Sequence, residues 1–384
     1  MSFVLALVSP AFPCGGFVPQ DTVTRVVSSD AQQAFFEVGP DHISVTYRVR
    51  YSGDAEDFAW IIPVPGPVDT VTEGVEATFD QLGELTAPLV QWDSPDDSGD
   101  GADDESGGCL CGDGSTGSNT KGFDEDALGG MGDTGFAGVV VTGEGFAGDF
   151  AYTTLEATGP NAMLGWLAEN GYDSTISKSQ IEQYESDTLG FTWVAVKLRP
   201  TTPVTPEGGV VLQPLKIEYS AGAEGSLHLL FPSRMGAGSM LNEFRTEIYV
   251  SAPTRVEPGN GWTMGQNTAE DDGFDVEGGQ DDNPEDLFDV LIRTAGSQTA
   301  VWPTYGNEWT DESGAQSYLV RYDTITEPGV NLTDITFAQT EDADSSIRTL
   351  IHIPRTYSRD TALVFAPLGM ITLAWHLRRR RARN

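Results

Sequence analysis

The C-terminal end of the chain carries the feature that most restricts what it can fold into. Residues 361–377 form a nearly uninterrupted apolar run, and a cluster of arginines follows it directly. Arginines resist transfer across a bilayer, so this order of segments stops translocation and leaves the arginines in the cytoplasm. The pattern predicts a transmembrane anchor, although the run lies near the lower length limit; a C-terminal core helix with a basic tail is the alternative. The anchor and its basic flank are expected to comprise Leu363, Phe365, Leu368, Leu373, Trp375, Arg378, Arg379, Arg380 and Arg381.

The N-terminus agrees with this interpretation. Residues 1–11 are apolar, and the small residues Ser9 and Ala11 suit cleavage by a signal peptidase after Ala11. The stretch is short and lacks a positive n-region, as expected of a truncated signal peptide. Together the two ends predict a single-pass protein of the cell membrane, with an N-terminal ectodomain outside the cytoplasm and residues 378–384 as a cytoplasmic tail.

The charge of the chain restricts its partners. Asp and Glu number 58 against 21 Lys and Arg, which gives a formal net charge of −37 at pH 7. Such a surface repels nucleic acid and attracts cations, a basic protein or another envelope component. The same charge keeps a protein soluble at high ionic strength, so adaptation to salt is an alternative explanation.

Hydrophobic periodicity predicts that the exported part of the chain, after residue 11, is β-rich. In residues 42–51 apolar and polar side chains alternate, which is typical of a half-buried strand. Residues 58–65 are instead a continuous apolar run that ends in prolines. Such a run is typical of a strand buried on both faces.

Two segments midway along the chain have helical patterns. Residues 161–171 carry an apolar stripe and end at Gly171, a typical helix stop, and residues 177–184 form a second short helix that Ser177 could cap. The expected fold class is therefore α+β and β-rich, with antiparallel sheets, two or three short inserted helices and one C-terminal transmembrane helix.

Two tracts interrupt the ectodomain. Residues 93–135 and 266–289 are rich in Asp and Gly, and their low hydrophobicity predicts disordered acidic insertions. Residues 341–360 are expected to connect the ectodomain to the membrane.

Carboxylates are the most abundant ligand groups. Asp54, Glu56 and Asp57 fall within four residues at the entrance of a strand, where they could bind a cation or cap a solvated turn. Asp96, Asp97 and Asp100 have the composition of a calcium loop but not the spacing of an EF-hand. Of the ions that proteins bind, these carboxylates favour calcium. The sequence establishes no cofactor.

Three cysteines occur in the chain. Cys14, Cys109 and Cys111 are too few for a disulfide scaffold, but in an exported protein one pair is expected to oxidise. Cys109 and Cys111 would be strained as a bridge to each other, which favours Cys14 with one of the two.

No sequence motif assigns an activity. No two histidines have the spacing of a zinc-hydrolase motif. The sequence also lacks the G-x-S-x-G motif that forms the nucleophile elbow of serine hydrolases. Catalysis by a Ser-His-Asp triad remains an alternative, because the three residues of such a triad come from distant positions and are recognised by their geometry. The aromatic residues Phe58, Trp60, Trp166, Tyr172 and Trp193 could line a ligand groove or belong to the core.

Several segments resemble a known family. Residues 51–65 (YSGDAEDFAWIIPVP) are the strongest match, and they are joined by residues 31–36 (AQQAFF), 164–172 (LGWLAENGY) and 193–198 (WVAVKL). These motifs resemble those of the bacterial domain of unknown function family 2330. A weaker match within residues 318–337 extends the resemblance, which implies that residues 12–340 form one β-rich ectodomain. The resemblance implies export, a cysteine near the mature N-terminus and often a C-terminal anchor, and it implies no activity.

The sequence favours a membrane-anchored cell-envelope protein whose acidic ectodomain binds cations or an extracellular partner without catalysis. The alternatives are an extracytoplasmic hydrolase without a recognisable motif and a purely structural, salt-adapted surface protein.

Overall fold

In the computed structural model of the chain, fifteen segments are described. They comprise residues 16–19, 31–51, 58–87, 89–92, 138–172, 178–187, 189–199, 210–220, 229–237, 244–259, 261–264, 300–310, 316–326, 333–339 and 350–353. The predicted signal peptide, both acidic insertions and the predicted anchor and tail lie outside these segments. Within them, no helix is both long enough and apolar enough to span a membrane.

A five-stranded antiparallel sheet forms one half of the core. Its strands in spatial order are β1 (Gly16–Pro19), β4 (Phe58–Val64), β9 (Thr192–Leu198), β8 (Phe150–Ala157) and β7 (Val139–Ala147). The continuous apolar run predicted to be buried on both faces is β4. Trp60 and Ile62 enter one hydrophobic cluster and Ala59 and Ile61 enter another, which confirms that prediction.

A nine-stranded sheet forms the other half. Its strands are β15 (Thr263–Met264), β16 (Ala300–Thr310), β17 (Gln316–Thr326), β13 (Phe244–Ala252), β2 (Ala31–Val38), β3 (His42–Tyr51), β11 (Leu215–Ser220) and β5 (Val68–Glu73), with β10 (Val210–Val211) also paired to β3. Strand β13 runs parallel to β2, and β15 runs parallel to β16. The sheet is therefore mixed, which corrects the expectation of antiparallel sheets only, because periodicity reveals a strand but not the direction of its neighbour.

Two small sheets complete the β structure. The first contains β12 (Leu229–Phe231), β18 (Ile335–Gln339) and β14 (Val256–Pro258). The second pairs β19 (Leu350–Ile353) with β6 (Leu89–Trp92) in parallel. Strand β19 belongs to the stretch that we expected to connect the ectodomain to the membrane.

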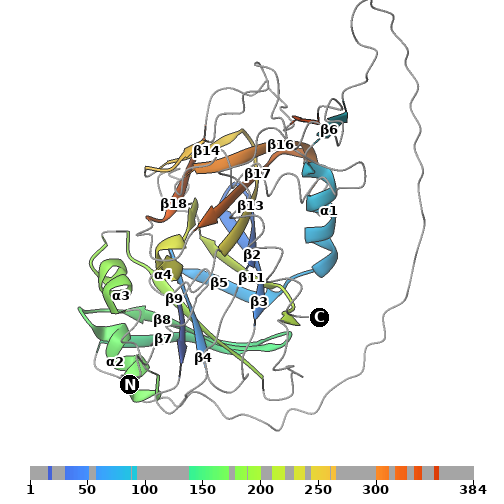
Figure 1. Cartoon of the computed structure of the whole chain (residues 1–384). Coiled ribbons are helices and arrows are strands. Elements are labelled where there is room, and N and C mark those ends of the chain that lie inside the picture. The colour runs from blue at the N-terminus through green and yellow to red at the C-terminus, as the bar shows by residue number, and fades with distance from the viewer. Residues whose placement is uncertain are drawn as a thin grey trace, which may run out of the picture.

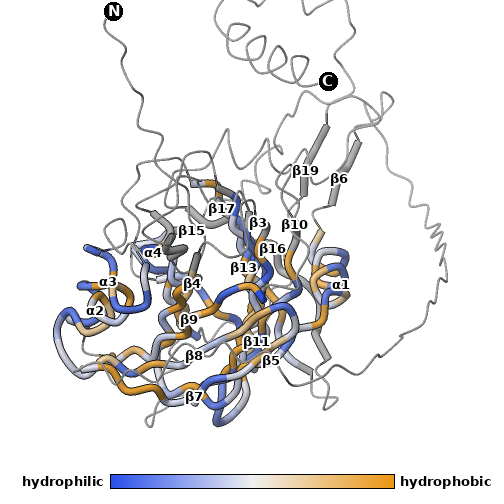
Figure 2. Tube along the Cα trace, turned by 90° about the horizontal axis from the view of Figure 1, so that it is seen from below, coloured by the Kyte–Doolittle hydropathy of each residue, from blue (hydrophilic) through white to orange (hydrophobic). Residues whose placement is uncertain are grey.

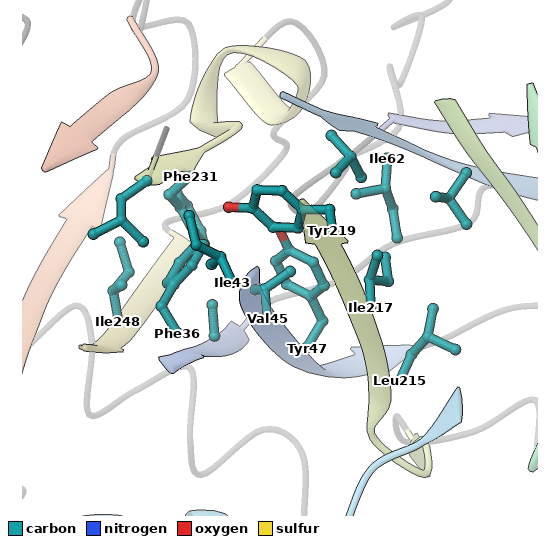
Figure 3. Packing of buried hydrophobic residues seen from close by; sticks show 14 of the residues in the cluster. Phe36, Ile43, Val45, Tyr47, Ile62, Leu215, Ile217, Tyr219, Phe231 and Ile248 are labelled. Atoms are coloured by element: carbon teal, nitrogen blue, oxygen red, sulfur yellow. The ribbon is translucent and has the colours of Figure 1, made fainter. Parts of the chain in front are cut away.

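The two large sheets share one hydrophobic core. Figure 3 shows side chains from β2, β3, β11, β13 and β4 pointing toward one another, and Phe231 of β12 closes one side. The alternating residues predicted from the sequence, Ile43, Val45 and Tyr47, all lie in this cluster. Burying such side chains stabilises the fold by about 1.5 to 3 kcal/mol each relative to exposure.

Helices cover the outer faces of the sheets (Figure 1). Helices α2 (Ala162–Glu169) and α3 (Lys178–Glu185) pack on the five-stranded sheet, and α1 (Glu76–Thr86) packs on the nine-stranded sheet through Phe79 and Leu82. A short fourth helix, α4 (Ser233–Ala237), follows β12. Four described helices exceed the two or three expected, and α1 was missed.

The predicted stop of α2 is confirmed. Gly171 has a φ of +81°, its N–H donates to the carbonyl of Ala168, and the N–H of Tyr172 donates to the carbonyl of Leu167. These two hydrogen bonds are those of a Schellman motif, which satisfies the last helical carbonyls. Trp60, Trp166, Tyr172 and Trp193 are all buried, so these four aromatic residues belong to the core, and the side chain of Phe58 lies outside the described ones.

Candidate functional site

None of the residues predicted to bind cations or form a disulfide can be placed. Asp54, Glu56 and Asp57 lie outside the described segments, as do Asp96, Asp97, Asp100 and the three cysteines. Across the described segments, no group of three or more His, Cys, Asp or Glu side chains could hold a metal ion. The charged groups that the structure does bring together are different ones.

A row of polar side chains crosses the outer face of the nine-stranded sheet. Register pairs Asp323 of β17 with Glu247 of β13, Glu247 with Gln33 of β2, and Gln33 with Arg48 of β3. Two acids thus stand directly opposite each other, an arrangement that is unfavourable without compensating charge. We call Asp323, Glu247, Gln33, Arg48 and the adjacent Arg321 and Arg245 the ionic row.

Two arginines compensate the paired acids. Arg321 binds Asp323 through both carboxylate oxygens, at 2.8 Å and 3.0 Å, and Arg245 reaches Asp323 at 3.2 Å and Glu247 at 2.9 Å. The Gln33 amide donates to Glu247 at 2.6 Å, and Arg48 donates to the Gln33 carbonyl oxygen at 2.6 Å. A bidentate arginine contact of this kind is among the stronger hydrogen-bonded pairs.

The two acids have opposite pKa shifts. Burial raises the pKa of Asp323 to about 6, despite the opposing attraction of Arg321. Burial would also raise the pKa of Glu247, but Arg321 and Arg245 outweigh it and hold that pKa below its usual range. A perturbed acid is a candidate for chemistry only where a ligand can reach it.

Helix α1 lies over part of this face. Phe79 and Leu82 form a cluster with Phe35, Tyr249 and Leu319 of the sheet. Arg48 joins the helix to the row, because its guanidinium pairs with Glu76 at 2.8 Å and lies 4.9 Å from the centre of the Phe79 ring. Asp323 is 0% exposed. Arg48 of the ionic row therefore attaches α1 to the sheet, and the acid with the raised pKa, Asp323, is out of reach of a ligand.

A second buried network joins three distant segments. Asp334, which precedes β18, accepts hydrogen bonds from the Tyr184 hydroxyl of α3 at 2.7 Å and from the Arg234 backbone N–H of α4 at 2.9 Å. The Arg234 guanidinium also pairs with Asp334 at 2.6 Å and lies over the Tyr184 ring. Burial, with the Asp334 carboxylate, raises the pKa of Tyr184 well above its usual range, so this tyrosine is a poor proton acceptor or nucleophile. We call Asp334, Tyr184 and Arg234 together the clamp.

Charges are segregated between the interior and the surface. Among residues whose exposure is described, Lys178 is the one exposed Lys or Arg side chain. The exposed acids of the same segments number ten, and we call them the acidic surface: Asp41, Asp69, Glu73, Glu76, Asp80, Glu84, Glu144, Glu156, Glu169 and Glu182. Arginines such as Arg245, Arg255 and Arg321 are turned inward into ion pairs. The exposed charged side chains of the described segments are therefore almost all acidic, and neither their arrangement nor the two buried networks could be predicted from sequence spacing.

One strand exposes apolar side chains at the rim of the molecule. Strand β7 is the last strand of the five-stranded sheet, and Figure 2 shows it at the lower rim with hydrophobic stretches along it. Val140, Val141 and Phe146 are 50%, 42% and 52% exposed, against two other large apolar side chains exposed in the described segments. An apolar concentration of this kind is more typical of a contact surface than scattered single residues are.

Comparison with known proteins gives one family. The model of a family described as "Uncharacterized protein conserved in bacteria (DUF2330)" matches residues 8–337. No protein of curated function matches the chain significantly. Among solved structures, the crystal structure of baculovirus P35 is similar at 11% sequence identity, with 82% of this chain and 97% of that chain covered and a TM-score of 0.32. So low a TM-score does not establish a shared fold.

Proposed function

This chain belongs to DUF2330, a bacterial family whose description assigns no activity, and we propose that it is a non-enzymatic binding protein of the cell envelope. In this proposal residues 1–11 direct export, residues 361–377 anchor the chain, and the ectodomain presents an acidic surface outside the cytoplasm. The ligands are cations or a basic protein or other basic envelope component.

The observation that carries the proposal is the segregation of charge. Composition alone would allow acids and bases to be mixed on the surface, but the described segments expose ten Asp and Glu side chains and, among Lys and Arg, only Lys178. Such a surface concentrates cations and speeds the encounter with a basic partner. Along α1 the acids Glu76, Asp80 and Glu84 follow at intervals of four residues, where like charges destabilise a helix.

The buried networks favour binding over catalysis. Asp323, the acid with a pKa of about 6, is fully buried between two arginines, and Tyr184 is buried in the clamp. Both groups stabilise packing between elements that are distant in the sequence. The hydrolase alternative would instead require an accessible base such as the exposed His42, and an activity that His42→Ala abolishes would favour it.

The first test is binding by the full-length chain. Octalysine and Ca²⁺ are titrated separately by calorimetry, and we expect octalysine affinity to fall at least about tenfold between about 0.05 M and 0.5 M NaCl. At low salt, the double variant Glu84→Gln with Glu169→Gln, which removes two charges of the acidic surface, should bind octalysine more weakly than the native chain. Lys178→Gln should not weaken it. Absence of binding at low salt would contradict the proposal and favour a structural, salt-adapted protein.

The second test concerns the anchor. Membrane fractionation compares the full-length chain with a chain that stops before Thr361, and only the full-length chain should partition with the membrane. If both are recovered in the soluble fraction, presentation at the membrane is wrong even if the acidic surface binds octalysine.

A further inference from the structure

Strand β7 has one edge that is hydrogen-bonded to no described strand, although the end of β5 approaches its turn at Gly148. It pairs with β8, and among the strands that the structure describes it pairs with no other. Edges of this kind leave a row of backbone N–H and C=O groups that another extended chain can pair with.

The register indicates which backbone groups face outward. Ala147 and Phe150 flank a two-residue turn, and such flanking pairs are hydrogen-bonded, with bonded and non-bonded pairs alternating along the hairpin. Gly145 is therefore bonded to β8, while Glu144 and Phe146 direct their N–H and C=O groups away from it. The part of β7 that contains Glu144 and Phe146 thus presents backbone hydrogen-bond donors and acceptors at the edge of the sheet.

The edge lacks most of the features that usually protect one. Natural edge strands are blocked by charged residues, prolines or bulges. Strand β7 has no proline and one charged residue, Glu144, and its irregularity between Val141 and Gly143 leaves the following residues in register with β8. Gly145 has no side chain to shield the backbone, and a Cβ there would lie 2.9 Å from the Tyr152 hydroxyl oxygen, which already covers this position.

We propose that β7 binds an extended segment of a basic partner protein, which adds to the five-stranded sheet as a sixth strand. The inference rests on the proposed function, since it names where and how the acidic ectodomain takes its partner. Val141, Glu144 and Phe146 lie on one face of the sheet, and Glu156 of the next strand lies on the other face. Apolar side chains of the added strand contact Phe146 and Val141 on the first face, and its basic side chains pair with Glu156 on the opposite face.

Charge complementarity decides between two occupants. A second copy of this chain would bring together two surfaces that each carry the acidic surface, on chains of formal charge −37. Coulomb repulsion between like-charged surfaces opposes such pairing. A segment in which apolar and basic residues alternate meets the same edge with attraction, because alternate side chains of a strand point to opposite faces.

The experiment measures peptide binding by the full-length chain. The probe is a heptapeptide of alternating valine and lysine, and the controls are a valine–glutamate heptapeptide and the valine–lysine peptide N-methylated at alternate residues. We expect the unmodified valine–lysine peptide to bind at least about tenfold more tightly than either control, a difference of about 1.4 kcal/mol. Amide hydrogen exchange should slow at Glu144 and Phe146 on binding.

Two variants locate the site. Glu144→Pro removes an outward N–H and a charge without removing a hydrogen bond to β8, and Phe146→Ser removes the exposed ring. Each should weaken peptide binding at least about tenfold. Leu189→Ser, a change at an exposed apolar residue of another segment, should leave it unchanged. Phe146→Ser keeps the test decisive if the proline variant does not fold.

Failure of the strand-addition proposal can be distinguished from failure of the proposed function. Equal affinity for the N-methylated peptide, or unchanged binding by Phe146→Ser, would overturn strand addition while octalysine binding still supported the acidic surface. Loss of both peptide and octalysine binding would overturn the proposed function as well. A dimer of the chain that Glu144→Pro dissociates would assign the edge to a second copy and overturn the basic partner.

Discussion

Asp323 and Glu247 lie directly opposite each other on neighbouring strands, and Arg321 and Arg245 compensate their repulsion. Buried ion pairs seldom exceed in stability the apolar groups that could replace them, but removing one partner is costly. The ionic row and the clamp should therefore be sensitive to single substitutions, and each has a titratable group whose pKa reports on its environment.

The pH dependence of stability should reveal Asp323. Its pKa of about 6 in the folded chain exceeds its usual 3.8, so the folded state binds this proton more tightly and the contribution of Asp323 to stability rises as pH falls from 7 to 4. The gain is at most about 3 kcal/mol. Denaturant unfolding across this range should show it as the difference between the native chain and Asp323→Asn. A flat difference, or one that falls toward low pH, would contradict the assignment.

The clamp should be held mainly by its ion pair. Asp334→Asn leaves the half-buried Arg234 without its carboxylate, and we expect a loss of about 3 kcal/mol in unfolding free energy. Tyr184→Phe removes one hydrogen bond and keeps the ion pair, so it should cost about 1 kcal/mol. Urea denaturation measures both. A larger loss for Tyr184→Phe than for Asp334→Asn would show that the hydrogen bond is the dominant contact.

At the scale of elements, α1 shows why local signals are incomplete. Its segment has no capping side chain, contains Gly83 and carries three acids on one side, so its own sequence predicts a helix poorly. What stabilises it is tertiary: Phe79 and Leu82 are buried against the sheet, and Arg48 pairs with Glu76. By contrast α2 has its stop signal, Gly171, in its own sequence.

Helix α1 should be easy to stabilise at its start. Val75 is the N-cap, with extended backbone angles (φ −99°, ψ 120°), no side-chain cap and 60% exposure. Val75→Ser supplies a hydroxyl that accepts from the first free N–H groups, so unfolding free energy should rise by about 1 kcal/mol. Val75→Ala removes the same side chain without a cap and serves as the control. Equal stability of the two variants in thermal denaturation would refute the capping explanation.

The α2 N-terminus relies on another element instead. Asn161 has a φ of +60° and makes no side-chain cap, while the Glu185 carboxylate of α3 accepts hydrogen bonds at 2.7 Å from the backbone N–H groups of Asn161 and Met163. A carboxylate at a helix N-terminus also interacts favourably with the helix dipole. The two helices therefore depend on each other for their local order.

At the scale of the molecule, two sheets face each other across one core, with helices on the outer faces and acids at the surface. The inward arginines neutralise the buried acids, and the exposed acids repel one another. Repulsion among surface charges lowers the stability of the compact state, and dissolved salt screens it.

Salt should therefore stabilise the ectodomain. Raising NaCl from about 0.05 M to about 1 M should raise the Tm by about 5 °C, and KCl should act equally because screening depends on ionic strength. The measurement is thermal unfolding followed by circular dichroism. A Tm that is independent of salt would show that the exposed acids are too far apart to destabilise the fold.

The sequence alone determined the family, the β-rich class, strands such as β3 and β4 and the Gly171 stop of α2, because each depends on local periodicity or local backbone geometry. Only the tertiary structure decided that β13 runs parallel to β2, that α1 exists, and that Asp323 meets Glu247 and Asp334 meets Tyr184. The contacts between strands and within the two buried networks named here join residues 76 to 214 positions apart, and α1 depends on a contact between Arg48 and Glu76, 28 positions apart. Local sequence patterns have no information about such partners. The acidic surface has the same origin: composition supplies the acids, but burial decided which charges stay outside.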